Sequence, residues 1–193
     1  LDTDVNTYLT SWEIPENKFT QVEKVTLRRI LSHTAGINVH GFPGYSTTDK
    51  FPSTTDVLNG YGNTPAIIVD TFPGSIHRYS GGAFTIMQLI VKDVSGMDLS
   101  EFMEKKIFPE IGMNESTFQQ PLNGDKIALA SGAHDYQGKL YEGGWHNYPE
   151  IAAAGLWTTP SDIAKFCIHI QNILNGKIEG VLKKDMVEQM LTR

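Results

Sequence analysis

The sequence contains a single cysteine, Cys167, among its 193 residues. One cysteine excludes a disulfide within the chain and any zinc site that is built from several cysteines. Cys167 falls on the apolar stripe of a predicted helix, and a free cysteine in such a place behaves as a small hydrophobic residue. We therefore expect Cys167 to be buried in the core and not to act as a nucleophile.

Positive charge is also scarce, because 16 Lys and Arg residues stand against 22 Asp and Glu, for a net charge of −6. No stretch gathers the basic residues that a nucleic-acid backbone requires. No apolar run approaches the roughly 20 residues that cross a bilayer. The sequence thus predicts neither nucleic-acid binding nor a membrane span.

Several motifs that hold cofactors or activate nucleophiles are missing from the sequence. It has no G-x-x-x-x-G-K-[ST] or G-x-G-x-x-G loop for a phosphate, and no G-x-S-x-G turn. None of its six histidines lie three to five residues apart on a helix, as zinc ligands do. We predict no cofactor and no metal site.

The composition that remains, with 40% hydrophobic and 20% charged residues, is typical of a globular chain. Its length fits one domain, and we expect residues 1–193 to form a single helical domain. Periodicity and capping residues predict a helix of about two turns within 25–36, and further helices over 56–61, 83–94, 99–112, 161–174 and 183–193. Thr26 is the expected cap of the first helix, Thr54 or Thr55 of the second, and Thr159 or Ser161 of the fifth, and Pro109 and Gly112 are expected to end the fourth. Residues 127–145 alternate imperfectly around Gln137-Gly138, which favours a small antiparallel hairpin.

The predicted helix over 83–94 is apolar on nearly every side, as in helices at the middle of a domain. Ser80 is a fitting N-cap, and Gly96 ends the helix. Pro73-Gly74 and, four residues later, Tyr79-Ser80-Gly81 lie at its mouth. This spacing is the most informative pattern in the chain.

Residues 73–118 resemble the P-G-x-x-x-x-Y-S-N region of the serine beta-lactamase-related family. VTLRRILSHTAGI at 25–37, AAAGLWTTPSDIAKF at 152–166 and LDTDVNTYL at 1–9 resemble other segments of the same family in the same order. The family includes class C beta-lactamases, penicillin-binding DD-peptidases, D-aminopeptidases and esterases. The resemblance implies a mainly α chain with a small antiparallel hairpin, the helical part of the beta-lactamase/transpeptidase-like α/β fold.

The resemblance also implies a serine hydrolase that cleaves beta-lactam, D-amino-acid peptide or ester bonds through an acyl-enzyme. Tyr79 would be catalytic, and Ser80 and Gly81 would bind substrate. The family's nucleophile is the serine of Ser-x-x-Lys, and its third motif is His-x-Gly or Lys-Thr-Gly; the sequence has none of these. We therefore expect an internal fragment of a larger enzyme, inactive by itself.

Tyr79 needs positive charge nearby to accept a proton. The N-terminus of the following helix contributes about 0.3 to 1 kcal/mol, and the rest would have to come from the lysine of Ser-x-x-Lys. The alternative is that Tyr79 is a surface aromatic residue at a helix mouth. Gly81 stands where the family pattern has Asn. This difference favours peptidase or esterase chemistry over beta-lactam hydrolysis. His33 is interpreted as a dipole-complementing or locally hydrogen-bonded residue, not a catalytic one.

A second function is compatible with the same residues. The chain could be a catalytically silent binding or sensor domain that holds a cell-wall peptide or a partner protein. For the enzyme, the expected partner is a small-molecule or peptide substrate, and an uncovered apolar face predicts a homo-oligomer. The resemblance alone implies a place in the cell envelope or secretion.

Overall fold

The computed structural model describes residues 1–192. They form two compact units, one made of Leu1–Leu99 with Gln119–Gly155 and the other of Ser100–Phe118 with the residues from Leu156 onward. That residues 1–193 form one domain stays a prediction. No helix within residues 1–192 is both long enough and apolar enough to cross a bilayer.

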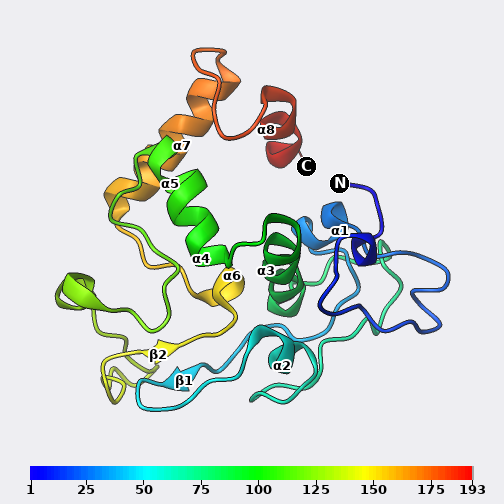
Figure 1. Cartoon of the computed structure of the whole chain (residues 1–193), viewed down its shortest axis with the longest axis horizontal. Helices are drawn as coiled ribbons and strands as arrows, with labels where there is room; N and C mark the ends of the chain where they lie inside the picture. The colour runs from blue at the N-terminus through cyan, green and yellow to red at the C-terminus, as the bar shows by residue number, and fades with distance from the viewer. Residues whose placement is uncertain (193) are drawn as a thin grey trace. The chain divides into compact units, whose positions relative to one another are not determined.

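The first unit is organised around helix α3 (Gly81–Ser95). Helices α1 (Leu27–Leu31), α2 (Thr54–Leu58) and α6 (Ile151–Ala154) pack against α3, and 3₁₀ turns form at Val5–Thr7 and Gly124–Leu129. Figure 1 shows α3 at the centre of these elements. The largest fully buried aliphatic side chains of the unit are Ile30, Ile37, Leu58, Ile67 and Ile86.

The predicted limits of α3 are confirmed. The Ser80 hydroxyl accepts a hydrogen bond from the amide of Ala83 at 3.0 Å, which satisfies one of the free N–H groups at the start of the helix. Gly96 ends the helix in the left-handed conformation, with φ +71°. Both signals are local, and both predict the observed ends.

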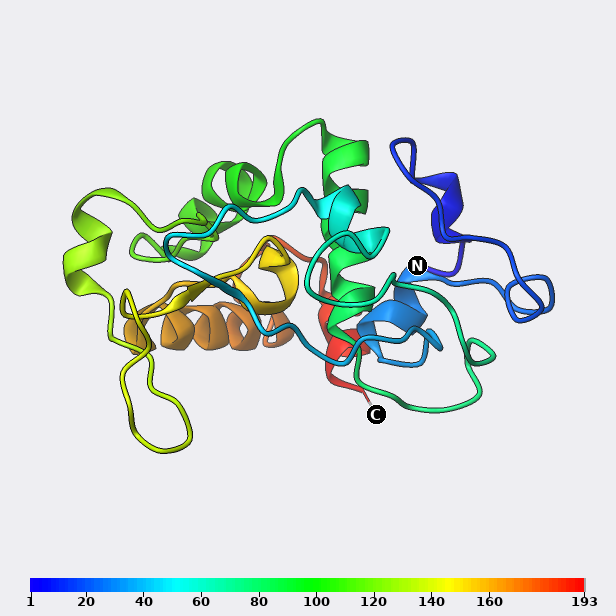
Figure 2. The same ribbon diagram turned by 90° about the horizontal axis from the view of Figure 1, so that it is seen from below.

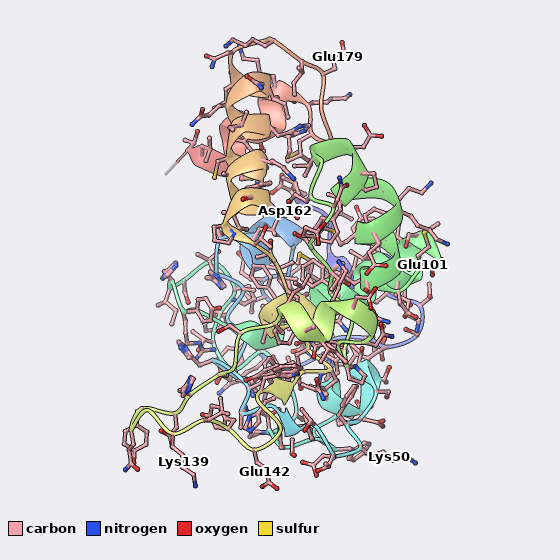
Figure 3. The ribbon with its side chains drawn as sticks, turned by 90° about the vertical axis from the view of Figure 1, so that its left-hand side faces the viewer. Lys50, Glu101, Lys139, Glu142, Asp162 and Glu179 are labelled. Atoms are coloured by element: carbon pink, nitrogen blue, oxygen red, sulfur yellow. The ribbon has the colours of Figure 1, made fainter. Side chains whose placement is uncertain are left out.

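The structure is mostly helical with one two-stranded antiparallel sheet, as predicted, but the sheet lies elsewhere. Strand β1 (Tyr45–Ser46) pairs with β2 (His146–Asn147), and Tyr45 is opposite Asn147. Around Gln137-Gly138 only one isolated bridge forms, between His134 and Leu140. Residues 133–142 make a solvent-exposed loop, called the open loop (Figure 2). At its base the amides of Asp135 and Tyr141 donate to the carbonyls of Lys139 and Ala133 at 2.9 Å and 3.0 Å, so the predicted turn forms without a two-stranded sheet. Lys139 and Glu142 lie exposed on this loop (Figure 3). A loop without a buried face gives no core contacts that would extend the pairing.

Two short helices differ from the sequence prediction. Ser53, and not Thr54 or Thr55, caps α2, in a capping box with Asp56. Helix α6 was not predicted, because its four residues, Ile151–Ala154, are too few to show a helical period.

The helix predicted over 99–112, which apart from Leu99 belongs to the second unit, is divided into three parts. Helix α4 (Leu99–Phe102) is followed by a π-helical turn at Met103–Ile107 and by α5 (Phe108–Ile111). Pro109 does not end the helix as predicted, because it lies in the first turn of α5, where its missing N–H costs no helical hydrogen bond. Gly112, at φ +80°, is the residue that ends it.

Helices α7 (Pro160–Leu174) and α8 (Lys184–Leu191) complete the second unit. Thr159 caps α7, as one of the two predicted caps. Ile170 and Ile173 are buried against Val187 of α8. Cys167, by contrast, is exposed. Its predicted burial is wrong, because the apolar stripe of α7 is covered only toward its C-terminal end.

Candidate active site

Tyr79 lies in the extended segment that leads into α3, and its side chain is 49% exposed. The next residue, Ser80, is only 2% exposed. The chain therefore passes from solvent into the core within one peptide unit. The phenol is left outside the core beside the N-terminus of a buried helix, where the helix dipole places partial positive charge.

The Ser80 hydroxyl is fully engaged within the protein. It accepts from the amide of Ala83 and donates to the carbonyl of Asn38 at 2.7 Å. A hydroxyl has one hydrogen to donate, so this geometry makes Ser80 the residue that joins the start of α3 to the segment around Asn38. Its predicted contact with substrate stays a prediction.

Gly81 is buried, and its amide donates to the carbonyl of His40 at 3.0 Å. A Cβ at this position would lie 3.0 Å from Cε2 of Phe42 and 3.2 Å from the His40 carbonyl oxygen. A side chain such as the family's Asn would require Phe42 to shift. The predicted substrate contact of Gly81 stays a prediction, and it can involve only the backbone.

Two histidine rings lie against Tyr79. The ring centroid of His33 is 4.4 Å from that of Tyr79, with 32° between the ring planes, and the centroid of His40 is 4.9 Å away, with 51° between planes. The sequence predicts no role for His40, because no local pattern signals this contact. The two histidines approach Tyr79 because the turn that follows α1 and the segment around Asn38 both form hydrogen bonds with residues 78–82.

His33 is not the dipole-complementing residue predicted from the sequence. Its Nδ1 accepts a hydrogen bond from the amide of Ser80 at 3.3 Å, which requires that nitrogen to be unprotonated. Burial, together with the neighbouring His77, lowers the pKa of His33. The ring is therefore neutral near pH 7, and its partner lies 47 residues away along the chain.

Arg78, the charged residue that precedes Tyr79 in the sequence, is already paired within the protein. Arg78 forms an ion pair with Asp70, and its amide donates to the carbonyl of His33 at 2.8 Å. Among residues 1–192, no three potential metal ligands lie together. Chemically, the arrangement offers an exposed phenol at a helix N-terminus, suited to moving a proton to or from a group brought to it.

Known proteins are similar to this chain in sequence and in fold. A putative D-alanyl-D-alanine carboxypeptidase of Salmonella schwarzengrund is 26% identical over 148 residues, which are 75% of this chain and 33% of that protein. The chain thus spans about a third of the curated relatives that it matches.

Two solved structures share the fold. The octameric penicillin-binding protein homologue of Pyrococcus abyssi superposes with a TM-score of 0.71 at 22% identity, over 100% of this chain and 43% of that one. The penicillin-binding protein of Bacillus halodurans gives 0.68 at 22% identity, over 99% of this chain and 55% of that one. The beta-lactamase family model matches residues 1–192, and the chain belongs to that family.

Proposed function

We propose that this chain is part of a serine hydrolase that works through an acyl-enzyme, with Tyr79 as a proton-transfer residue. The observation that carries the proposal is the placement of Tyr79, half-exposed at the N-terminus of a capped and buried helix. Membership of the beta-lactamase family supports the reaction class. A serine from the full-length protein would attack the carbonyl, and Tyr79 would move the proton between the serine and the leaving group.

For the substrate class, we favour D-amino-acid peptides or esters over beta-lactams. A curated relative is named as a putative D-alanyl-D-alanine carboxypeptidase. The buried Gly81 offers no side-chain amide, in the position where the family pattern has Asn, and the close approach of Phe42 leaves little space for one. This choice concerns the full-length protein.

The test is Tyr79→Phe in the full-length protein, assayed with a D-alanyl-D-alanine peptide and an activated ester. General acid–base groups contribute about 10²- to 10⁴-fold, so kcat/KM should fall by a factor in that range. The melting temperature should stay close to that of the wild type, because the ring lies outside the core. Tyr136→Phe is the matched control, since Tyr136 is 95% exposed on the open loop.

Activity of Tyr79→Phe within about threefold of the wild type would contradict the catalytic role, and unfolding of the variant would make Tyr79 a structural residue. Absence of acylation by a fluorophosphonate in the full-length wild type would favour the other candidate, a silent binding or sensor domain. Binding of a D-alanyl-D-alanine peptide without turnover would support that candidate directly.

A further inference from the structure

Strained backbone surrounds the Tyr79 segment. Among residues 1–192, two residues other than glycine have positive φ, His33 at +55° and Val39 at +57°. Side chains crowd the backbone in this region, and for a β-branched residue such as valine it is a genuine outlier. Such strain is kept where the surrounding structure enforces it, and it clusters at functional sites. Both residues belong to segments that bond directly to residues 78–82.

His33 occupies a position that usually belongs to glycine. The amide of Thr34 donates to the carbonyl of Arg29 at 2.8 Å, and the amide of His33 donates to that of Ile30 at 3.1 Å. This pair of bonds is a Schellman motif, whose left-handed residue is most often glycine because glycine has no Cβ. Here that residue carries an imidazole, which contacts Tyr79 and accepts the Ser80 amide hydrogen.

Val39 and His40 hold the other side of the segment. The amide of Gly82 donates to the carbonyl of Val39 at 3.1 Å, and the amide of Gly81 donates to that of His40 at 3.0 Å. These bonds hold the backbone of His40 beside the start of α3, where the His40 ring contacts Tyr79. The His40 side chain is itself exposed, so core packing does not account for its position.

We propose that His33 and His40 are positioning residues, whose imidazoles both contact the Tyr79 ring and so orient its phenol oxygen for proton transfer. This inference rests on the proposed function of Tyr79. A half-exposed tyrosine on an extended segment otherwise samples several rotamers, and proton transfer requires the oxygen within hydrogen-bond reach of its partner. The neutral His33 ring acts by contact and by its Nδ1 acceptor.

The test uses the full-length protein and four variants assayed with one peptide or ester substrate. His33→Asn tolerates the left-handed backbone and keeps an acceptor but removes the ring. His40→Ala removes the second ring, whereas His40→Phe keeps an aromatic ring there. His134→Asn is the matched control, because His134 is exposed on the open loop of the same unit.

We expect His33→Asn and His40→Ala each to lower kcat about tenfold or more, with KM and the melting temperature nearly unchanged, because only orientation is lost. His40→Phe should restore kcat to within about threefold of the wild type, and His134→Asn should match it. If either His33→Asn or His40→Ala fails to fold, the kcat of the other variant still tests the positioning role.

A second measurement does not depend on activity. In protein labelled with ¹³C-tyrosine, the Tyr79 ring signals, identified by their loss in Tyr79→Phe, should shift in both His33→Asn and His40→Ala. Wild-type kcat in both histidine variants, while Tyr79→Phe is inactive, would overturn this inference alone. An active Tyr79→Phe would overturn the proposed function and this inference together.

Discussion

At the scale of single residues, Glu150 is the most unusual group outside the candidate site. It is fully buried at the start of α6, and neither carboxyl oxygen has a hydrogen-bond partner outside its own residue. Burial raises the pKa of Glu150 to about 7, against a smaller opposing effect of its own backbone amide. A buried carboxylate without a partner is costly, so the protonated form is favoured in the folded state.

This burial predicts a pH-dependent stability. The folded state binds the Glu150 proton more tightly than the unfolded state, whose pKa is near 4.5. The stability that the proton contributes is therefore complete below pH 4.5 and is lost as pH rises through about 7. Over that window the loss from this one group is on the order of 3 kcal/mol.

We expect Glu150→Gln to remove this dependence and to be more stable than the wild type at pH 8. Urea unfolding of both proteins at pH 5 and pH 8 measures the difference. Glu142→Gln, on the exposed open loop, is the control and should not alter the slope. Equal pH slopes for the wild type and Glu150→Gln would show that Glu150 is ionised in the folded state.

At the scale of elements, the side chain of Asp162 connects the start of α7 to residues 115 and 116 (Figure 3). Its carboxylate accepts hydrogen bonds from the amide of Glu115 at 2.9 Å, the hydroxyl of Ser116 at 2.9 Å and Nζ of Lys165 at 2.8 Å. Burial alone raises the pKa of Asp162, but these donors outweigh it and hold the pKa below its usual value. The carboxylate thus joins the segment after α5 to α7.

Asp162→Asn should destabilise the second unit by on the order of 2 to 4 kcal/mol, because an amide cannot accept all three bonds and its own N–H groups lack partners. The wild type should lose the contribution of Asp162 as pH falls through its lowered pKa, and the variant should not. Thermal melts from pH 7 to pH 3 measure both effects. Asp185→Asn in α8, where the side chain is exposed, should change stability by less than about 0.5 kcal/mol.

Gly36 and Gly96 have the same left-handed backbone conformation but different surroundings. Comparing alanine substitutions at the two positions therefore distinguishes the cost of backbone strain from the cost of a steric clash. Gly36 has φ +69° and Gly96 has φ +71°. A Cβ at Gly36 would lie 2.1 Å from the carbonyl oxygen of Thr71, whereas one at Gly96 would meet nothing within 4 Å. Gly96→Ala should therefore cost only the left-handed strain, about 1 to 2 kcal/mol.

Gly36→Ala should cost clearly more than Gly96→Ala, because the backbone of residues 36 and 71 must separate. The free energies of unfolding in urea, measured side by side, give the comparison. Similar values for the two variants would mean that the backbone near Thr71 relaxes easily.

At the scale of the whole molecule, α7 presents an apolar surface. Ile163 and Phe166, one turn apart on the same face of the helix, are 41% and 36% exposed. Exposed apolar patches favour association, so we expect the chain to self-associate as its concentration rises. Sedimentation velocity over a hundredfold concentration range measures this.

The double substitution Ile163→Lys with Phe166→Lys should shift the chain toward monomer. Leu129→Lys, which charges an exposed apolar residue of the other unit, should leave the association unchanged. A wild type that sediments as a monomer throughout would exclude this surface as an interface of the chain.

The sequence by itself determined the features that depend on neighbouring residues. Ser80 and Gly96 bound α3, and Thr26 and Thr159 cap α1 and α7, because capping bonds join residues two or three apart. The spacing from Pro73 to Tyr79 also indicated the family, which the match over residues 1–192 confirms. A single cysteine excluded an internal disulfide from the start.

Only the tertiary structure decided which distant residues meet. The pairing of Tyr45 with Asn147, the contact of His33 with Ser80 and the burial of Glu150 join segments that no local period relates. The exposure of Cys167 likewise depends on what covers α7, and not on the stripe along it. Local hydrogen bonds and periodicity depend on residues that are close together in the sequence, whereas burial and long-range contacts depend on how the elements pack.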